Sequence, residues 1–280
     1  MLGKKFYLVF IFNLIFTLLM GCGSNVAQLN NNESTSPQEL YVLPSSGDDI
    51  ISHSINDKPN IDSFILPPQF YRQGVVINIA AMRIYSFNNN QVFSSKVALG
   101  REGWRTPLTK TTVYRKTEAP VWTVPASIKK HSLEKHGKIL PDVVPAGPGN
   151  PLGDYAIYLH LPGYLIHGTN DPKSIGHLVS SGCIRMDNRD VAILYNRVNP
   201  GTPVSIIYYP NIVGWKDNLL YLEVYHPISH EKQIYEKAEI PTSELIQQAI
   251  ANRPAIVDWA QVQAALQKQS GIPTLIGRAK

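Results

Sequence analysis

The sequence predicts a mainly β domain followed by a short C-terminal appendix with helices. Two observations carry this prediction. Short runs rich in β-branched and aromatic residues recur between residues 74 and 209, and, apart from one helix-like stretch at 127–136, helical periodicity appears only after residue 240. The chain has 280 residues, enough for one medium domain with additions or for two small ones. Its 44% hydrophobic content is ordinary for a globular protein.

The N-terminal residues 1–21 are typical of an export signal. Lys4 and Lys5 precede an apolar run at 6–20 that is shorter than the roughly 20 residues a membrane span needs. The run ends in Leu-Met-Gly-Cys22, which resembles the lipobox of bacterial lipoproteins and implies lipidation of Cys22. Gly23 is not an aspartate, which favours sorting to the outer membrane. Ordinary signal cleavage and a retained anchor helix are the alternatives.

A polar segment separates this leader from the first predicted strand. Residues 22–70 are expected to form a flexible tether, rich in Ser, Asn and Gln, and then an extended strap. The net charge of +5 falls to +3 once Lys4 and Lys5 are removed. A small positive excess suits an acidic polymer such as a cell wall. Basic clusters with interleaved aromatic residues are missing from the sequence, so nucleic-acid binding is not expected.

The predicted strands follow one another from residue 75 onward. They cover 75–79, 82–85, 92–99, 111–114, 121–125, 155–159, 164–167 and 204–209, with a turn at 88–90 and a helix-like stretch at 127–136. Residues 143–153 are too rich in Pro and Gly for a regular element. Long ordered loops of this kind tend to line sites. In the appendix, 210–280, a strand at 218–225 and helices starting near Thr242 and Asp258 are expected to pack on the preceding domain.

The strongest functional signal is a histidine and a cysteine in one short region. His167 lies in Ile-His-Gly-Thr-Asn and Cys183 in Ser-Ser-Gly-Cys-Ile-Arg-Met. A thiol becomes a useful nucleophile when a neighbouring group, most often a histidine, favours its thiolate. The flanking glycines allow backbone N–H groups to approach a forming oxyanion. The only other cysteine, Cys22, belongs to the leader, so a disulfide is not expected.

A metal site is the competing interpretation of this region. His160, His167 and His177 could be imagined around an ion together with Cys183. Their spacing matches no familiar zinc pattern, and no second cysteine stands nearby. We therefore expect neither a metal nor another cofactor.

Taken together, these motifs resemble the L,D-transpeptidases with a YkuD-type catalytic domain. The resemblance covers residues 66–209 and includes Pro-Ala-Gly-Pro-Gly-Asn-Pro-Leu-Gly before the histidine strand. It is strongest to the periplasmic subgroup typified by ErfK, YbiS, YcfS and YnhG. The resemblance implies a β-sandwich-like catalytic domain, here residues 71–209. Relatives often carry a LysM wall-binding module before this domain, and residues 41–70 are too few to hold one.

The resemblance implies a role for each motif residue. Cys183 is the expected nucleophile, and His167 the proton donor and acceptor, oriented by the carbonyl of Gly168. The N–H groups of Gly182 and Cys183 are the oxyanion candidates, with Ser181 beside them. Substrate binding is expected from Arg185, Thr169 and Asn170. The sequence departs from relatives at 176–178, and at Ser181, where many members carry a second histidine.

The implied reaction takes place on bacterial peptidoglycan. Cys183 would attack the diaminopimelate–D-Ala bond of a tetrapeptide stem, release D-Ala and pass the acyl group to an amine. That amine belongs to another stem, giving a 3→3 cross-link, or to a lysine of an outer-membrane lipoprotein. An L,D-carboxypeptidase or amidohydrolase using the same thioester, and an inactive wall-binding lipoprotein, remain as alternatives. The implied location is the periplasm of a Gram-negative bacterium, with an anchor in the outer membrane through Cys22.

Overall fold

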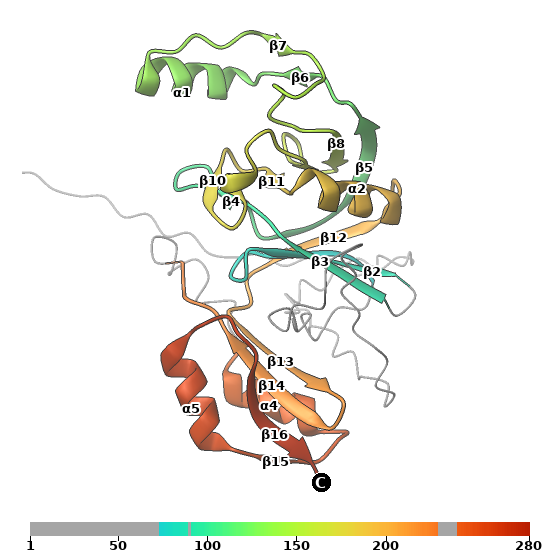
Figure 1. Cartoon of the computed structure of the whole chain (residues 1–280), viewed down its shortest axis with the longest axis vertical. Helices are drawn as coiled ribbons and strands as arrows, with labels where there is room; N and C mark the ends of the chain where they lie inside the picture. Colours follow the sequence, from blue (N-terminus) through green and yellow to red (C-terminus); the bar gives the residue numbers. More distant parts are fainter. Residues whose placement is uncertain (1–72, 89–90, 229–239) are drawn as a thin grey trace, which may run out of the picture. The chain divides into compact units, whose positions relative to one another are not determined.

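A computed structural model describes residues 73–88, 91–228 and 240–280 of the chain (Figure 1). The following predictions lie outside the described residues: the signal peptide, Cys22, and the tether and strap of 22–70. Of the expected turn at 88–90, only Asn88 is described. Within the described ranges, no helix is both long and apolar enough to cross a membrane.

The larger part of the described chain is built on one eight-stranded sheet. Its strands are, in sheet order, β11 (Ile184–Arg185), β9 (Leu165–His167), β8 (Tyr155–Leu159), β5 (Thr109–Glu118), β12 (Pro203–Ile207), β1 (Gly74–Asn78), β2 (Arg83–Asn88) and β3 (Gln91–Lys96). Pairing is antiparallel except for β1 with β12 and β11 with β9. A short parallel pair, β4 (Leu99–Gly100) and β10 (Leu178–Ser180), lies beside it in the fold.

The long strand β5 turns this sheet back on itself. Residues 109–112 of β5 pair with β12, whereas residues 113–118 pair with β8, and the register shifts between Val113 and Arg115. An extra residue in one strand bends it and increases its twist. Helix α2 (Asn188–Arg197) contacts β8 and β9 in one half of the sheet and β2 in the other. The sheet therefore curls around α2.

Apolar residues of α2 and of the strands form the main core. The helix contributes Val191 and Leu194, both fully buried, because its apolar positions fall on one face. Strands β1, β8 and β12 each contribute two alternate residues, as the two-residue period of a strand requires. Other fully or almost fully buried members are Val75, Ile77, Ile84, Val97, Leu99, Val113, Ile157, Ile166, Ile184, Met186, Val204 and Ile206.

A polar excursion follows β5. It consists of β6 (Trp122–Thr123), α1 (Ala126–His136) and β7 (Val143–Val144), and β6 pairs with β7 (Figure 1). The sequence predicted no regular element at 143–153. This was wrong for its first two residues, because Val143 and Val144 pair with Thr123 and Trp122 in a two-stranded ladder. Helix α1 buries only Ser132 and ends at Gly137, whose φ of 61° is left-handed and therefore suits glycine.

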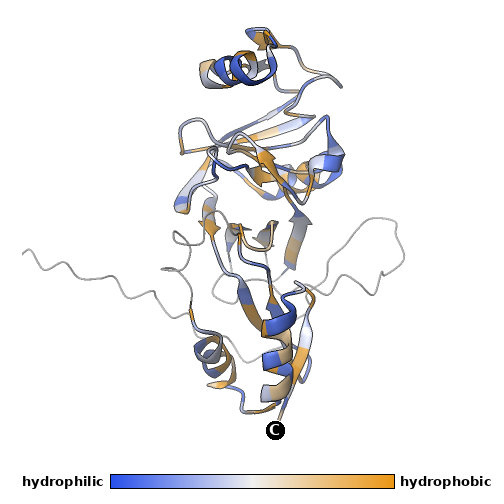
Figure 2. Ribbon diagram, turned by 90° about the vertical axis from the view of Figure 1, so that its left-hand side faces the viewer, coloured by the Kyte–Doolittle hydropathy of each residue, from blue (hydrophilic) through white to orange (hydrophobic). Residues whose placement is uncertain are grey.

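Residues 211–224 and 242–279 contain a second sheet with its own apolar core. The sheet order is β13 (Asn211–Lys216), β14 (Leu219–Val224), β16 (Thr274–Ala279) and β15 (Ala255–Val257). Helix α4 (Thr242–Ile250) packs on β13, and α5 (Trp259–Lys268) packs on β14 and β16 (Figure 1). Both helices carry hydrophobic and hydrophilic residues (Figure 2). Their apolar faces meet the strands around Val213, Leu222, Leu245, Ile246, Val262 and Ile276.

The predicted mainly β class, with helices in the C-terminal appendix, is confirmed. The sandwich-like form arises from one curled sheet. The appendix contains four strands where the sequence indicated one. Of the three that were not predicted, β15 has only three residues and lies between α4 and α5, whereas β13 and β16 have six residues each. Helix α2 follows directly after the cysteine motif and was not predicted.

Candidate active site

The edge of the large sheet brings the two sequence motifs together. Strand β9 ends in His167, and β11 pairs with it in parallel, so that Arg185 stands opposite His167 and Ile184 opposite Ile166. Cys183 directly precedes β11 and therefore begins the same strand pair. The sheet register, and not chance proximity in sequence, thus places these residues at one edge.

The imidazole of His167 is buried and held in one orientation. Its exposed fraction is 4%, and its Nδ1 lies 2.6 Å from the carbonyl oxygen of Gly168. A carbonyl can only accept, so Nδ1 carries the proton and Nε2 keeps its lone pair. Burial, and then the charge of Arg185, lower the pKa of His167 to about 4, although hydrogen bonds to the Gly168 and Leu152 backbone raise it. The ring is therefore a neutral base at neutral pH.

The thiol of Cys183 is also held in its neutral form. Cys183 is a free cysteine and half-buried, with Sγ 3.5 Å from the carbonyl oxygen of Gly163. Burial raises the pKa of the Cys183 thiol, against the opposing effects of a hydrogen bond with the Leu165 backbone and of the Arg185 charge. A thiol next to a neutral imidazole needs its proton removed during attack. In this respect the site differs from the histidine-favoured thiolate that the two motifs suggested.

Arg185 is the cation of the site. Its backbone exchanges two hydrogen bonds of 2.9 Å with Ala98, which fixes the strand from the other side. Its buried Nε has no hydrogen-bond partner within the described part of the chain. Burial lowers the pKa of Arg185, while the charge of Asp171 raises it. A guanidinium keeps its charge even so, and its unpaired donor is suited to an anionic ligand.

The turn before Cys183 is built from its own hydrogen bonds. The Oγ of Ser180 accepts from the Gly182 N–H at 3.1 Å and donates to the Cys183 carbonyl at 2.6 Å. Gly182 has a φ of 107°, which a residue with a Cβ rarely adopts. The Gly182 N–H, one of the two expected oxyanion donors, is therefore already bonded to Ser180.

A second loop, residues 101–108 between β4 and β5, holds this turn through side-chain hydrogen bonds. Buried Thr106 donates through Oγ1 to the Gly182 carbonyl at 2.8 Å. Arg101 Nη1 donates to the carbonyls of Val179 at 3.3 Å and Ser180 at 3.1 Å, and to Ser181 Oγ at 3.0 Å. Neither Thr106 nor Arg101 was predicted from the sequence. No local signal marks them, because 76 to 80 residues separate them from Gly182 and Ser181.

The Pro- and Gly-rich loop borders the histidine, as its composition predicted for a loop that lines a site. Asn150 is fully buried, and its Nδ2 donates to the Pro120 and Pro145 carbonyls at 2.8 and 3.1 Å. Its Oδ1 accepts from the Leu152 N–H at 2.9 Å. Asn150 therefore shapes the segment whose Leu152 backbone contacts His167.

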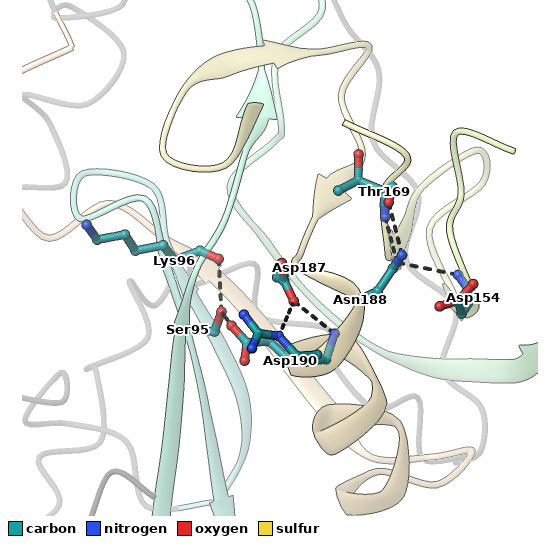
Figure 3. Close-up of polar contacts among 8 residues, drawn as sticks. Ser95, Lys96, Asp154, Thr169, Asp187, Asn188 and Asp190 are labelled. Atoms are coloured by element: carbon teal, nitrogen blue, oxygen red, sulfur yellow. Dashed lines mark hydrogen bonds and ion pairs between the residues drawn. The ribbon is translucent and has the colours of Figure 1, made fainter. Parts of the chain in front are cut away.

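Asn188, the first residue of α2, clamps the backbone after His167 (Figure 3). Its Oδ1 accepts from the Thr169 N–H at 3.0 Å, and its Nδ2 donates to the Thr169 carbonyl at 3.1 Å. The Asp154 N–H also points to Oδ1, at 3.5 Å (Figure 3). A Cβ on Gly168 would stand 2.0 Å from this oxygen, so the clamp needs glycine there. Asp187 and Asn188 are typical helix-start residues, and this signal could have identified the clamp.

The two residues after Gly168 differ in exposure. Thr169 is buried, and its Oγ1 accepts from the Asp171 N–H at 3.0 Å. Asn170 is exposed and donates from Nδ2 to the Gly149 carbonyl at 3.1 Å. Thr169 thus contacts the protein itself, and Asn170 is the member of the pair with access to a ligand.

The histidines considered for a metal site contact different parts of the protein. His160 packs edge-on against Tyr114, with ring centroids 5.0 Å apart, and the carbonyl of His177 accepts from the Leu99 N–H. Among the residues that the structure describes, no group of three or more His, Cys, Asp or Glu is arranged to hold a metal ion.

The comparisons with known proteins match this chain to one family. Residues 72–206 match the YkuD family, the L,D-transpeptidase catalytic domain, and residues 216–276 match the L,D-transpeptidase C-terminal domain. The chain belongs to the L,D-transpeptidase family. This confirms the resemblance found in the motifs. The second match assigns a domain of the same family to the region that the sequence predicted as an appendix.

Sequence matches to individual relatives cover most of the chain. The probable L,D-transpeptidase ErfK/SrfK of Escherichia coli K12 is 37% identical over 89% of this chain and 78% of its own length. The probable L,D-transpeptidase YbiS of the same strain is 38% identical, over 76% of this chain and 71% of its own. A solved L,D-transpeptidase from Mycobacterium smegmatis is 22% identical, covers 47% of this chain and 57% of its own, and has a TM-score of 0.37.

Proposed function

We propose that this protein is a peptidoglycan L,D-transpeptidase with Cys183 as nucleophile and His167 as general base and acid. One observation carries the assignment of roles. The Nδ1 of His167 is bound to the Gly168 carbonyl at 2.6 Å, which leaves Nε2 as a lone-pair base on the strand next to Cys183. Family membership supports the transpeptidase chemistry.

The first half-reaction makes a thioester. The Cys183 sulfur attacks the diaminopimelate carbonyl of a tetrapeptide stem while its proton passes to His167 Nε2. The resulting oxyanion is stabilised by backbone N–H groups. His167 then gives this proton to the nitrogen of the leaving D-Ala, the C–N bond breaks, and the acyl group remains on sulfur.

The second half-reaction transfers the acyl group to an amine. An amino group of another stem, or a lysine of an outer-membrane lipoprotein, attacks the thioester as His167 takes its proton. The C–S bond breaks, and the sulfur recovers a proton from His167, so the enzyme returns to its starting state. Buried imidazole and half-buried thiol both favour neutral forms, which suits a base that removes a proton only during attack.

Charge supports an anionic substrate. Arg185 has a buried Nε without a hydrogen-bond partner in the described ranges, and a guanidinium binds carboxylates well. We assign Arg185 to a carboxylate of the stem peptide and exposed Asn170 to its backbone. We give buried Thr169 a role in holding the loop. Ser181 shapes the turn together with Arg101.

The cellular setting follows from the leader and the family. We propose that residues 1–21 direct export, that Cys22 is lipidated, and that residues 22–70 tether the enzyme to the outer membrane of a Gram-negative bacterium. The catalytic domain, residues 71–209, would then act on the wall from the periplasmic side. Residues 210–280 form an associated C-terminal domain.

Intact-protein mass spectrometry of the purified full-length chain, incubated with disaccharide-tetrapeptide, tests this function. We expect an acyl-enzyme lacking D-Ala and a cross-linked dimer product, both absent in Cys183→Ala. The chain offers a matched control, since Cys22→Ala removes its only other cysteine and should retain turnover. Release of tripeptide alone would assign the same thioester to a carboxypeptidase or amidohydrolase. A folded protein with no adduct and no turnover would leave a wall-binding role.

A further inference from the structure

We propose that Thr106 is a positioning residue that aims the backbone N–H of Cys183 at the oxyanion of the reaction. This inference rests on the proposed function, in which Cys183 is the nucleophile. Thr106 belongs neither to the histidine motif nor to the cysteine motif. It lies in the loop between β4 and β5 and reaches the nucleophile turn through its side chain.

The hydroxyl of Thr106 has one fixed orientation. Its Oγ1 accepts from the Gly100 N–H at 3.0 Å and lies 2.8 Å from the Gly182 carbonyl oxygen. A hydroxyl has a single proton, and a carbonyl can only accept, so that proton points to Gly182. The side chain is 3% exposed, which keeps water from competing for either bond.

This bond fixes a peptide plane at the nucleophile. In a trans peptide, the C=O of one residue and the N–H of the next point in opposite directions. The peptide between Gly182 and Cys183 is trans. Because Thr106 holds the Gly182 carbonyl on one side, the Cys183 N–H must point to the other side, away from Thr106.

The remaining contacts of the turn leave Cys183 as the donor. The other candidate, the Gly182 N–H, donates to Ser180 Oγ at 3.1 Å. The φ of 107° at Gly182 lies in a region where glycine rotates at little cost, so the peptide plane depends on outside contacts. Thr106 supplies the contact at the Gly182 carbonyl itself, and Arg101 braces the carbonyls of Val179 and Ser180.

The loop that carries Thr106 is itself tightly packed. A Cβ on Gly100 would stand 2.0 Å from the Trp104 carbonyl oxygen and 2.8 Å from the Thr106 nitrogen. Arg101 lies over the Trp104 ring, with its Cζ 5.1 Å from the centroid. A rigid support of this kind is what an oxyanion donor requires, because donors contribute most when they need no rearrangement during the reaction.

Two reagents that modify the same thiol separate this role from a general structural role. A carbapenem acylates through a tetrahedral oxyanion, whereas iodoacetamide alkylates sulfur without forming one. In a Cys22→Ala background, both rates at Cys183 are measured by mass spectrometry for the full-length chain. For Thr106→Val we expect acylation to fall about 10- to 100-fold, with alkylation within about twofold of the parent. Thr106→Ser, which keeps the hydroxyl, should restore acylation.

A matched control lies in the next strand. The Oγ1 of Thr111 is buried and has no hydrogen-bond partner in the described ranges, so Thr111→Val should change neither rate. Thr106→Ala removes the same hydroxyl if the valine variant does not fold. Unchanged acylation in a folded Thr106 variant, or an equal fall in both rates, overturns the role of Thr106 alone. A parent protein that is alkylated but never acylated overturns the proposed function as well.

Discussion

The Nδ1 atom of His167 donates to the carbonyl of Gly168, the next residue in the chain, across 2.6 Å. Under the proposed function, this contact takes the place of the acidic partner that orients many catalytic histidines. A carbonyl cannot take up the proton and carries no full charge, so it fixes the tautomer without strongly stabilising an imidazolium. Burial and the nearby charge of Arg185 therefore dominate, and the pKa of His167 falls to about 4.

The lowered pKa of His167 predicts a specific loss of stability in acid. Between the ordinary pKa of 6.5 and about 4, the unfolded chain binds a proton at this ring that the folded protein does not. The free energy of unfolding should therefore fall as pH drops through this window, by about 3 kcal/mol for this one group. Above pH 6.5 the contribution is complete and constant. Urea unfolding at a series of pH values measures it.

The matched variant is His167→Asn, whose amide can still donate to the Gly168 carbonyl but does not titrate in this range. Carboxylates titrate in both proteins, so the difference between the two profiles isolates His167. If the free energy of unfolding changes with pH in parallel for the two proteins across this window, the ring is protonated equally in the folded and unfolded states.

The close approach of Gly168 to Asn188 predicts that Gly168→Ala is strongly destabilising. The new Cβ would lie 2.0 Å from Asn188 Oδ1, an atom held by the Thr169 N–H. Overpacking against a fixed group costs about 1–3 kcal/mol, and we expect the upper end here. Gly149→Ala is the control in the neighbouring loop, because a Cβ there meets nothing within 4 Å. Thermal unfolding of both variants gives the comparison.

A double-mutant cycle assigns this loss to the Asn188 amide. In an Asn188→Ala background, the added cost of Gly168→Ala should fall by more than half, since the clashing oxygen is gone. An equal cost in both backgrounds would place the strain elsewhere, for example at Asp154 N, which lies 3.3 Å from the same Cβ.

The sequence was informative where the signal is local. Runs rich in β-branched and aromatic residues marked β1, β2, β8 and β9, and the spacing of apolar residues marked α4. The start at Asp258 and the stop at Gly271 marked α5. The histidine and cysteine motifs were sufficient by themselves to indicate the family. Such signals depend on residues a few positions apart, so the sequence alone displays them.

Contacts between distant segments of the chain could not be predicted from local sequence signals. Thr106 meets Gly182 across 76 positions, and nothing in the residues around either one indicates the other. The same holds for the two halves of β5, whose partners β12 and β8 are set by the curl of the sheet and not by the β5 sequence. Short strands such as β11 and β15 gain their identity from pairing alone, because two or three residues show no period.

Lys116 should stabilise the end of α2. Its Nζ donates to the carbonyls of Tyr195 and Val198 at 2.7 and 2.8 Å, and it lies 4.4 Å from the centre of the Tyr195 ring. The last carbonyls of a helix have no partner within the helix and attract a cation. We expect Lys116→Met to lower the free energy of unfolding by about 1–2 kcal/mol. Lys110→Met, an exposed position on the same strand, should change it by less than about 0.5 kcal/mol. Equal changes in the free energy of urea unfolding for the two variants would contradict this role of Lys116.

Neighbouring residues of β16 test whether the C-terminal domain depends on its own core. Ile276 is fully buried among residues of α4, α5 and β14, whereas Leu275 faces the other side of the sheet and is 46% exposed. Removing a buried isoleucine side chain leaves a cavity, so we expect Ile276→Ala to cost about 3 kcal/mol. Leu275→Ala should cost about 1 kcal/mol or less, because much of its surface already contacts water.

Hydrogen exchange of the β14 and β16 amides, measured together with the unfolding curves, shows in which sheet stability is lost. Faster exchange in β13–β16 with unchanged exchange in β8 and β9 is the expected pattern for Ile276→Ala, and equal acceleration in both sheets would show that the two cores unfold as one unit.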